Sequence, residues 1–376
     1  MASAPFRSWV EVSRDTIAAN YRAIKGVVGP GVEVMPVVKA DAYRHGAVEV
    51  ARVLEREGVT WLAVSSVDEG VQLRESGCAA RILIMADFLP SEREALLEFS
   101  LTPVIHSLDH LRSLDAIAAR HGCVISYHLK LDTGMTRLGA LCRPPDIIHA
   151  VAAAPHTRLE GLMTHFASAA RYDRRQTDEQ IRAFASVRDQ LLQSGLRPAY
   201  THLAATIPVA YGRREAWGNM VRPGHAIYGY VSPVRGNGPE PVLQVQPALQ
   251  WKAAILETKT VPSGTPVGYG AMYRTPEPMR LGILAVGYAD GLPHRLSNRG
   301  FVIAAGSVVS ILGAVSMDLT TVDLTPAPSL QVGDSVTLLG AEGDARIDAQ
   351  QIARQAGTIS YSVLCGISAR VRRIYI

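Results

Sequence analysis

The chain has 376 residues, of which 48% are hydrophobic and 19% charged, and its formal net charge is +4. This composition is globular, so it argues against a disordered chain and against a nucleic-acid partner. The chain is too long for one ordinary core, which predicts one large barrel or two domains. No apolar run could span a membrane and no signal-peptide core is seen, so we expect a cytoplasmic protein without a membrane partner.

The cysteines are widely spaced and form no CxxC pair. This spacing predicts reduced thiols rather than a disulfide or metal-binding framework. We therefore expect no metal ion to be held by the four cysteines, which are Cys78, Cys123, Cys142 and Cys365.

Short apolar runs alternate with amphipathic segments between residues 30 and 230. The apolar runs predict strands at 34–38, 61–65, 82–85, 103–106, 124–131 and 159–164. Helical periodicity predicts helices at 14–24, 108–119 and 180–192. This alternation indicates a parallel α/β sheet, closed as a barrel or doubly wound. The first strand–helix turn lacks a GxGxxG motif, which favours the barrel.

The pattern changes near residue 233, where the segment SPVRGNGPEP reads as a linker. The runs after it predict a helix at 348–355 and strands at 253–258, 280–286, 301–304, 308–312 and 334–339. We therefore predict an α/β domain at residues 1–235 and a mainly β domain at residues 236–376.

Lysine is rare in this chain. Of 38 Lys and Arg residues, five are lysine, namely Lys25, Lys39, Lys130, Lys252 and Lys259. An arginine stays protonated and cannot act as a nucleophile, so a lysine here indicates a need for an amine. Lys39 and Lys130 are the candidates because each ends an apolar run.

Three polar residues follow predicted strands, namely Lys39, Lys130 and His165. The C-terminal ends of parallel barrel strands share one rim, so these side chains should converge there. Burial would lower the pKa of a rim lysine and expose a neutral amine that can form an imine with a carbonyl group or with pyridoxal phosphate. Thr206 and the turn at Gly224-His225 could donate hydrogen bonds to a phosphate. Taken alone, each residue also fits a purely structural role.

The chain resembles the alanine racemase family over nearly its whole length. VVKADAYRHGA is similar to the family's cofactor-lysine segment, and HLKLDTGMTRLG to its second signature. Further family segments match in the same order: THFASA, VRPGHAIYG, VGYGAMY, LAVGYADG, AVSMDL and ISYSVLC. So many ordered segments across two domains are far more specific than any one of them.

The resemblance implies a (β/α)8 TIM barrel followed by a mainly β C-terminal domain, with pyridoxal 5'-phosphate as cofactor. It also implies a homodimer in which each active site takes residues from the partner's β domain. The implied activity is the interconversion of L-alanine and D-alanine, which would supply D-alanine for peptidoglycan.

The family's two-base mechanism assigns Lys39 to the cofactor linkage and to one face of the substrate α-carbon. Tyr269 of the partner subunit would serve the other face. A phenol has an ordinary pKa of about 10, so a cation such as Arg137 would have to assist it. Tyr273 is the nearest competitor, but the family's tyrosine opens the YGAxY segment, which favours Tyr269.

Other residues would hold the cofactor and substrate. Arg222 matches the arginine at the pyridine nitrogen, where its fixed charge would suppress transamination, and His165 would bond Arg222. Arg137 and the backbone of Met317 of the partner subunit would bind the substrate carboxylate. Lys130 matches a lysine that many members carry as a carbamate. The matched phosphate-binding positions are Tyr43, Thr206, Gly224, His225 and Tyr361.

The chain departs from the family pattern at three places. Arg44 and Thr136 stand where the family usually has glycine, and Ala205-Thr206 replaces an Asn-Ser pair. Thr206 keeps a hydroxyl group, whereas Ala205 lacks an amide. These departures bear on cofactor affinity rather than on the reaction class.

Three alternatives stay open. A racemase of broader scope, acting for example on serine, is one, because a small apolar pocket discriminates weakly against an added hydroxyl. A non-catalytic, single-barrel pyridoxal phosphate-binding protein is the second, and the Tyr269 and Met317 segments argue against it. A decarboxylase of the same two-domain plan is the third, and Arg222 argues against it.

Overall fold

The computed structural model describes residues 4, 6–86 and 88–376 and divides into two compact units. The barrel unit contains Ile17–Ala42 and Ala47–Gln246. The β unit contains the described residues up to Thr16 together with Tyr43–Gly46 and Pro247–Ile376. Among the described residues, no helix is long and apolar enough to cross a membrane.

The barrel unit is built on parallel strands that close into a ring. Six strands pair in the order β3-β4-β5-β6-β7-β8, and β2 pairs with β9. The Val37–Ala63 bridge joins the β2 segment to β3, and the His202–Gly218 bridge joins β8 to the β9 segment. The strands are β2 (Glu33–Val34), β3 (Trp61–Val64), β4 (Arg81–Ile84), β5 (Thr102–Ile105), β6 (Ile125–Lys130), β7 (Thr157–Met163), β8 (Tyr200–His202) and β9 (Met220–Val221).

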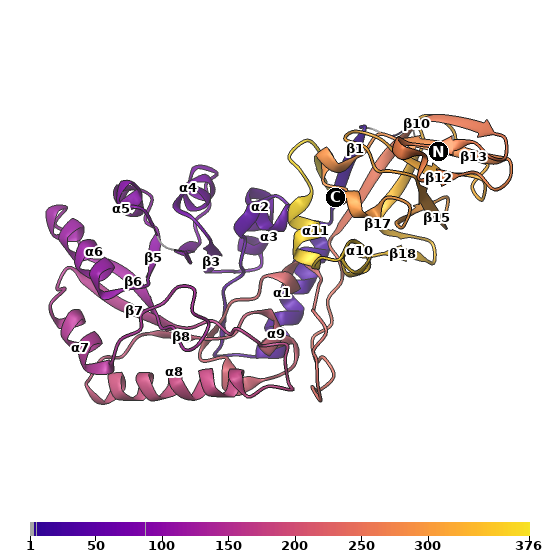
Figure 1. Cartoon of the computed structure of the whole chain (residues 1–376). Helices are drawn as coiled ribbons and strands as arrows, with labels where there is room; N and C mark the ends of the chain where they lie inside the picture. Colours follow the sequence, from indigo (N-terminus) through magenta and orange to yellow (C-terminus); the bar gives the residue numbers. More distant parts are fainter. Residues whose placement is uncertain (1–3, 5, 87) are drawn as a thin grey trace. The chain divides into compact units, whose positions relative to one another are not determined.

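Helices cover the outer face of these strands, with α4 to α8 around the sheet in Figure 1. Their covering explains why every residue of β3 and β5 is buried. Side chains cap the N-termini of two of these helices. Ser66 and Glu69 form a capping box at α4, and Ser107 caps α6. The helices are α1 (Arg14–Val28), α3 (Ala47–Arg56), α4 (Val67–Glu75), α5 (Arg93–Glu98), α6 (Leu108–Arg120), α7 (Pro144–Ala152), α8 (Gln176–Gln193) and α9 (Thr206–Ala210).

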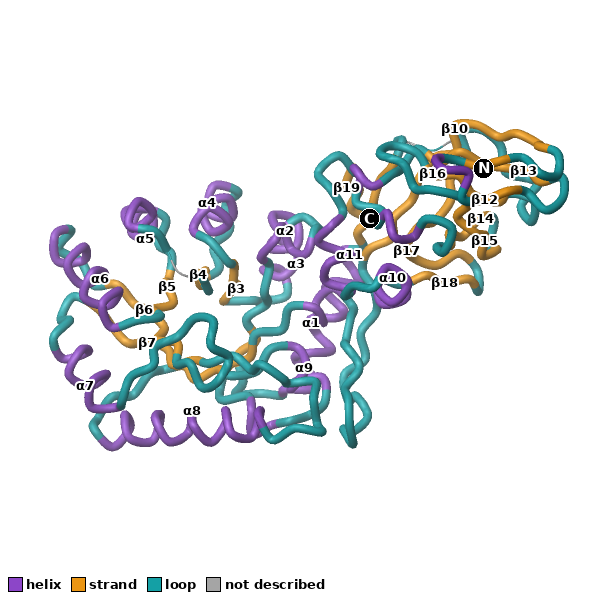
Figure 2. The backbone as a smooth tube through the Cα atoms, viewed as in Figure 1, coloured by secondary structure: helices purple, strands orange, loops and turns teal. Residues whose placement is uncertain are grey.

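The β unit is a mostly antiparallel sheet with the strand order β18-β17-β14-β15-β16-β13-β10-β1-β19, and β17 also pairs with β10. Strands and loops dominate it in Figure 2, and α10 packs on α11. Its elements are β1 (Ser8–Val12), β10 (Leu249–Val261), β11 (Pro266–Val267), β12 (Tyr273–Arg274), β13 (Met279–Leu284), β14 (Phe301–Ala304), β15 (Ser307–Leu312), β16 (Thr320–Asp323), β17 (Ser335–Glu342), β18 (Ala345–Ile347), α10 (Ala349–Ala356), α11 (Ser360–Gly366) and β19 (Arg372–Tyr375).

The prediction of a parallel barrel followed by a mainly β domain is confirmed. The structure adds a strand that the sequence reading did not predict: β1 pairs antiparallel with β10, with Ser8 opposite Ala253 and Val12 opposite Leu249. This pairing places the start of the chain in the β unit. The predicted division at residues 235 and 236 stays a prediction.

Candidate active site

The backbone after Lys39 forms a left-handed turn. Five consecutive residues, Ala40 to Arg44, have φ between 53° and 67°. A left-handed conformation costs about 1–2 kcal/mol per non-glycine residue, so neighbouring groups must stabilise the turn. Within the barrel unit, the Ala40 N–H donates to the carboxylate of Glu69 at 2.6 Å, and the Ala47 N–H donates to that of Asp41 at 2.8 Å. These bonds hold Lys39 where the strand segment ends.

Lys39, Lys130 and His165 lie close enough to influence one another's charge. Burial, followed by the positive charge of Arg137, lowers the pKa of Lys130 to about 8. Burial and the charge of Arg222 lower the pKa of His165 to about 3, with smaller effects from both lysines. His165 is therefore neutral at physiological pH. The predicted convergence of these groups at one end of the barrel is confirmed.

Arg222 is fully enclosed, with 2% of its surface exposed. One terminal nitrogen bonds His202 Nδ1 at 2.8 Å and the His202 carbonyl at 2.8 Å. The other donates to the carbonyls of Thr164 and Leu203 at 2.7 and 3.0 Å and contacts His165 Nδ1 at 3.4 Å, as predicted for His165. Burial lowers the pKa of Arg222 to about 9, which leaves it charged at neutral pH. The structure gives Nε no acceptor among the described residues.

Thr206 lies at the first turn of α9, beside the turn that contains Gly224. Its hydroxyl oxygen accepts from the N–H groups of Gly224 at 3.2 Å and Ala226 at 3.3 Å. The ring of His225 is buried and stacks on Tyr230 with centroids 5.1 Å apart. Because both N–H groups donate to the Thr206 oxygen, the donor that this place offers to a phosphate is the Thr206 O–H.

Asp132 organises the loop that carries Arg137. Its pKa is lowered because its carboxylate accepts backbone hydrogen bonds, which outweigh its burial. Thr136 in this loop has a φ of 56°, which is the left-handed conformation that glycine favours, although the residue here is threonine. Arg137 is exposed. The N–H groups bonded to Asp132 Oδ1 are those of Gly134, Met135 and Thr136.

In the β unit, the segment from Tyr43 to Gly46 contacts α11. The rings of Tyr43 and Tyr361 lie 6.0 Å apart, and burial raises the pKa of Tyr43. Arg44 Nε donates to the Cys365 carbonyl at 3.3 Å, near the C-terminus of α11. Arg373 Nε in turn donates to the Arg44 carbonyl at 3.2 Å. Two of the predicted phosphate-binding residues thus share one cluster.

Tyr269 and Met317 lie on neighbouring loops of the β unit, and both side chains are exposed, by 77% and 53%. Gly268 has a φ of 69°, and a Cβ atom there would lie 3.3 Å from the Ala314 nitrogen. This close approach brings the Tyr269 turn next to the segment that leads to Met317. No acceptor for the Met317 N–H is found in the described part of the chain.

The competing tyrosine is engaged elsewhere. The hydroxyl of Tyr273 lies 3.4 Å from the sulfur of Met279, and its ring packs on the cluster formed by Val267, Met279, Leu281 and Leu312. Tyr273 is therefore a packing residue of this hairpin, which favours Tyr269 as the reactive tyrosine.

The sequence reading missed His202, which bonds Arg222 directly. Its position as the last residue of β8 was the signal, since His165 likewise lies just beyond the end of β7. Ala205 is the N-cap of α9 and makes no side-chain cap bond, so the lost amide is not replaced there. Among the described residues, no cluster of His, Cys, Asp or Glu could hold a metal ion.

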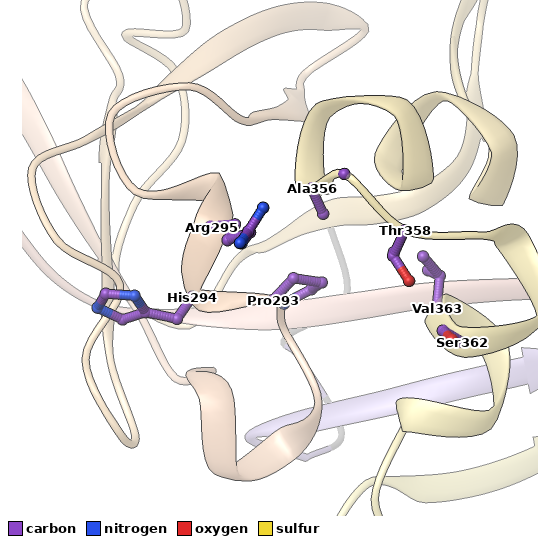
Figure 3. Close-up of a pocket in the computed structure, with 8 residues that line it drawn as sticks. Pro293, His294, Arg295, Ala356, Thr358, Ser362 and Val363 are labelled. Atoms are coloured by element: carbon purple, nitrogen blue, oxygen red, sulfur yellow. The ribbon is translucent and has the colours of Figure 1, made fainter.

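Two surface cavities are lined by other residues than the predicted site residues. One of about 460 Å³ adjoins the loop at 131–143 in the barrel unit. The other, of about 380 Å³, is in the β unit; Figure 3 shows Thr358 and Ser362 on one side of it and His294 extending away from them. Neither cavity is lined by a predicted site residue.

The lysine, the buried arginine and the phosphate-type donors at the C-terminal end of a parallel barrel, together with a β unit, define a barrel enzyme of the pyridoxal phosphate type. Family models support this class. "Alanine racemase, N-terminal domain" matches residues 12–233, and "Alanine racemase, C-terminal domain" matches residues 248–375. The chain belongs to the alanine racemase family.

Individual relatives agree over full length. The chain is 38% identical to the alanine racemase of Halothermothrix orenii over 98% of this chain and 96% of that one. It is 39% identical to that of Carboxydothermus hydrogenoformans over 98% and 99%. The solved structure from Streptomyces lavendulae has a TM-score of 0.92 at 31% identity, covering 99% and 98% of the two chains. The Bartonella henselae structure, with covalently bound pyridoxal phosphate, has a TM-score of 0.87 at 26% identity, covering 99% and 100%.

Proposed function

We propose that the chain interconverts L-alanine and D-alanine with two bases, Lys39 and Tyr269, in a homodimer whose active sites are shared. The reaction and the use of pyridoxal phosphate follow from family membership. We assign the residue roles, the dimer, a cytoplasmic location and the supply of D-alanine for peptidoglycan as parts of this proposal. The four cysteines are free, which fits a reducing compartment.

The residues of the barrel unit fit the cofactor. Lys39 offers an amine at the rim, and the Thr206 hydroxyl, whose oxygen accepts from the Gly224 and Ala226 N–H groups, can donate its proton to a phosphate. Arg222 Nε–H is left without a protein acceptor among the described residues and suits the pyridine nitrogen. When bound, pyridoxal phosphate acts as an electron sink that makes the substrate's α-proton removable.

Lys39 then takes or returns the α-proton on one face through Nζ. The neutral amine is the form that accepts a proton. Arg222 keeps its charge and only donates, so it opposes protonation of the pyridine nitrogen. Arg137 and the N–H of Met317 of the partner subunit hold the substrate carboxylate and orient the α-carbon between the two bases.

Tyr269 acts on the other face through its hydroxyl group. The Tyr269 side chain is exposed by 77%, so its hydroxyl group is accessible to a substrate held by a partner subunit. Met272, at 54%, and Met317 are exposed in the same unit, which gives a dimer interface apolar area to bury.

The contacts around Lys39 carry this proposal, and a spectrum tests it. The Lys39→Ala protein should lose the visible absorbance of the covalently held cofactor and its racemase activity. Lys259→Ala, which changes a β10 lysine, should keep both. An unchanged spectrum in Lys39→Ala would remove Lys39 from its role.

The substrate is tested by a panel of L-amino acids assayed for D-product. We expect the highest kcat/KM for alanine. A higher value for serine would favour the broader-scope alternative.

A further inference from the structure

A chain of buried hydrogen bonds runs inward from Arg222 through the barrel. Arg222 bonds His202 Nδ1 at 2.8 Å, and His202 Nε2 lies 2.8 Å from His128 Nδ1. His128 and His202 are 0% exposed and Arg222 is 2% exposed. His128 and Lys130 share one face of β6 because side chains alternate along a strand. The chain therefore begins at the proposed cofactor ring and ends deep in the barrel.

The direction of each bond follows from its donors. A guanidinium group can only donate, so His202 Nδ1 must accept and carry no proton. A neutral His202 then carries its proton on Nε2 and donates it to His128. His128 Nδ1 must accept, which places the proton of His128 on Nε2. One charged group thus sets the tautomers of two histidines.

The surroundings of His128 keep it neutral. Burial lowers its pKa to about 3, with further lowering by Arg81 and Arg222. Its ring packs against those of Trp61 and Tyr200, with centroids 5.4 Å and 6.0 Å away, and these two rings are themselves 5.6 Å apart. Burial and the charge of Arg222 hold the pKa of His202 well below its usual value. Neither ring can become a second cation beside Arg222.

The Nε2 atom of His128 does not favour either tautomer. It has no hydrogen-bond partner among the described residues. One tautomer leaves a buried N–H there and the opposite one leaves a buried lone pair, and each is unfavourable. The opposite tautomer would also place two N–H groups against each other at His202. The contact with His202 therefore decides the proton's position.

We infer that His128 is a positioning residue for the racemase reaction. By accepting the hydrogen bond from His202 Nε2, His128 keeps the lone pair of His202 Nδ1 directed at the Arg222 guanidinium. His128 touches neither substrate nor cofactor, and its effect passes through two side chains. The inference rests on the proposed function in one respect, namely that Arg222 contacts the pyridine nitrogen of the cofactor. The tautomers themselves follow from the barrel unit alone.

The direct test is nitrogen-15 NMR of the histidine rings in the full-length protein, before and after loading with pyridoxal phosphate. The chain has 11 histidines, and single substitutions assign the signals. We expect His202 and His128 both to be neutral and protonated at Nε2. A proton on Nδ1 of either ring would overturn the inference, whether or not the protein racemises alanine.

A matched pair of variants tests the consequence. His128→Asn keeps an acceptor near the Nδ1 position, whereas His128→Leu removes it at similar size. We expect His128→Leu to raise the ratio of half-transamination, which gives pyruvate and pyridoxamine phosphate, to racemisation by about tenfold, the effect of one buried hydrogen bond. His128→Asn should restore the ratio.

Tyr127→Phe is the control on the same strand, since its buried hydroxyl has no partner among the described residues. It should leave the ratio unchanged. Equal ratios in His128→Leu and wild type would contradict a positioning role. If His128→Leu does not fold, the wild-type NMR result still decides the inference. A wild-type protein without racemase activity would refute the proposed function and not the tautomers.

Discussion

Lys130 illustrates how one residue's environment sets its chemistry. Burial and the charges of Arg137 and Arg222 lower its pKa to about 8. Near that pH about half of the amine is neutral, and a neutral amine is the form that reacts with carbon dioxide. A carbamate would replace a repelled ammonium by an anion that attracts both arginines.

We predict a carbamate on Lys130 whose amount rises as the pH is raised towards and through 8. Carbon-13 NMR of protein equilibrated with labelled bicarbonate should show its signal. Lys130→Gln should abolish that signal, and Lys259→Gln should leave it in place. A signal that persists in Lys130→Gln would assign the carbamate to another amine.

Among the local elements of the fold, two loops have a left-handed backbone conformation at a residue that is not glycine. Arg44 has a φ of 67° and Thr136 a φ of 56°. The bond from Arg44 to the Cys365 carbonyl offsets part of the strain at Arg44, since a cation near a helix C-terminus is favourable. Within the described ranges, the Thr136 side chain makes no hydrogen bond, and only its backbone N–H is bonded, to Asp132.

Thr136→Gly should therefore stabilise the protein by about 1 kcal/mol, because glycine removes the left-handed strain. The free energy of unfolding, measured in urea, checks this. Met135→Gly is the matched control: Met135 is not among the positive-φ residues, so glycine there should destabilise. A loss of stability in Thr136→Gly would show that its side chain contributes more than the strain costs.

The elements with a strong local pattern could be predicted from sequence. The prediction at 301–304 coincides with β14, and that at 108–119 ends one residue before α6. The left-handed turn could not be predicted, because no glycine marks residues 40–44. The role of β1 was equally hidden, since its partner β10 lies more than 200 residues away in the chain.

The same limit holds for the site. Lys39, His165 and Arg222 could be placed because strand ends and family motifs mark them. The link from His202 to His128 needed side-chain directions, which a sequence pattern does not supply.

At the scale of the whole molecule, buried neutral histidines make stability depend on pH. Burial lowers the pKa of His128 and His165 to about 3, and the pKa of His202 is also lowered. An unfolded histidine titrates at about 6.5, so between those values the unfolded chain binds more protons. Stability from these groups is full above about pH 6.5 and is lost as the pH falls towards 3.

We predict that the free energy of unfolding falls by up to about 1.4 kcal/mol per histidine per pH unit below pH 6. Urea unfolding at pH 7.5, 6.0 and 5.0 measures the slope. His128→Asn should make it shallower by one proton. A slope of zero between pH 6 and 5 would contradict the neutral assignment.

Shared active sites make a second prediction for the assembled protein. Lys39→Ala and Tyr269→Phe homodimers should each be inactive, but a dimer with one chain of each has one site with both bases. Mixing the unfolded variants in equal amounts and refolding should recover about a quarter of wild-type activity, as random pairing in a twofold dimer requires. No recovery would mean that both bases come from one chain.

The central claim is that Lys39 and Tyr269 act on opposite faces of the substrate. Deuterium exchange at the α-carbon in heavy water tests it most directly, with the Tyr269→Phe variant and each enantiomer of alanine in turn. We expect that Lys39 still exchanges the α-proton of D-alanine, while L-alanine exchanges at least about a hundredfold more slowly and no racemic product accumulates. Equal exchange of both enantiomers, or racemisation at the wild-type rate, would contradict it.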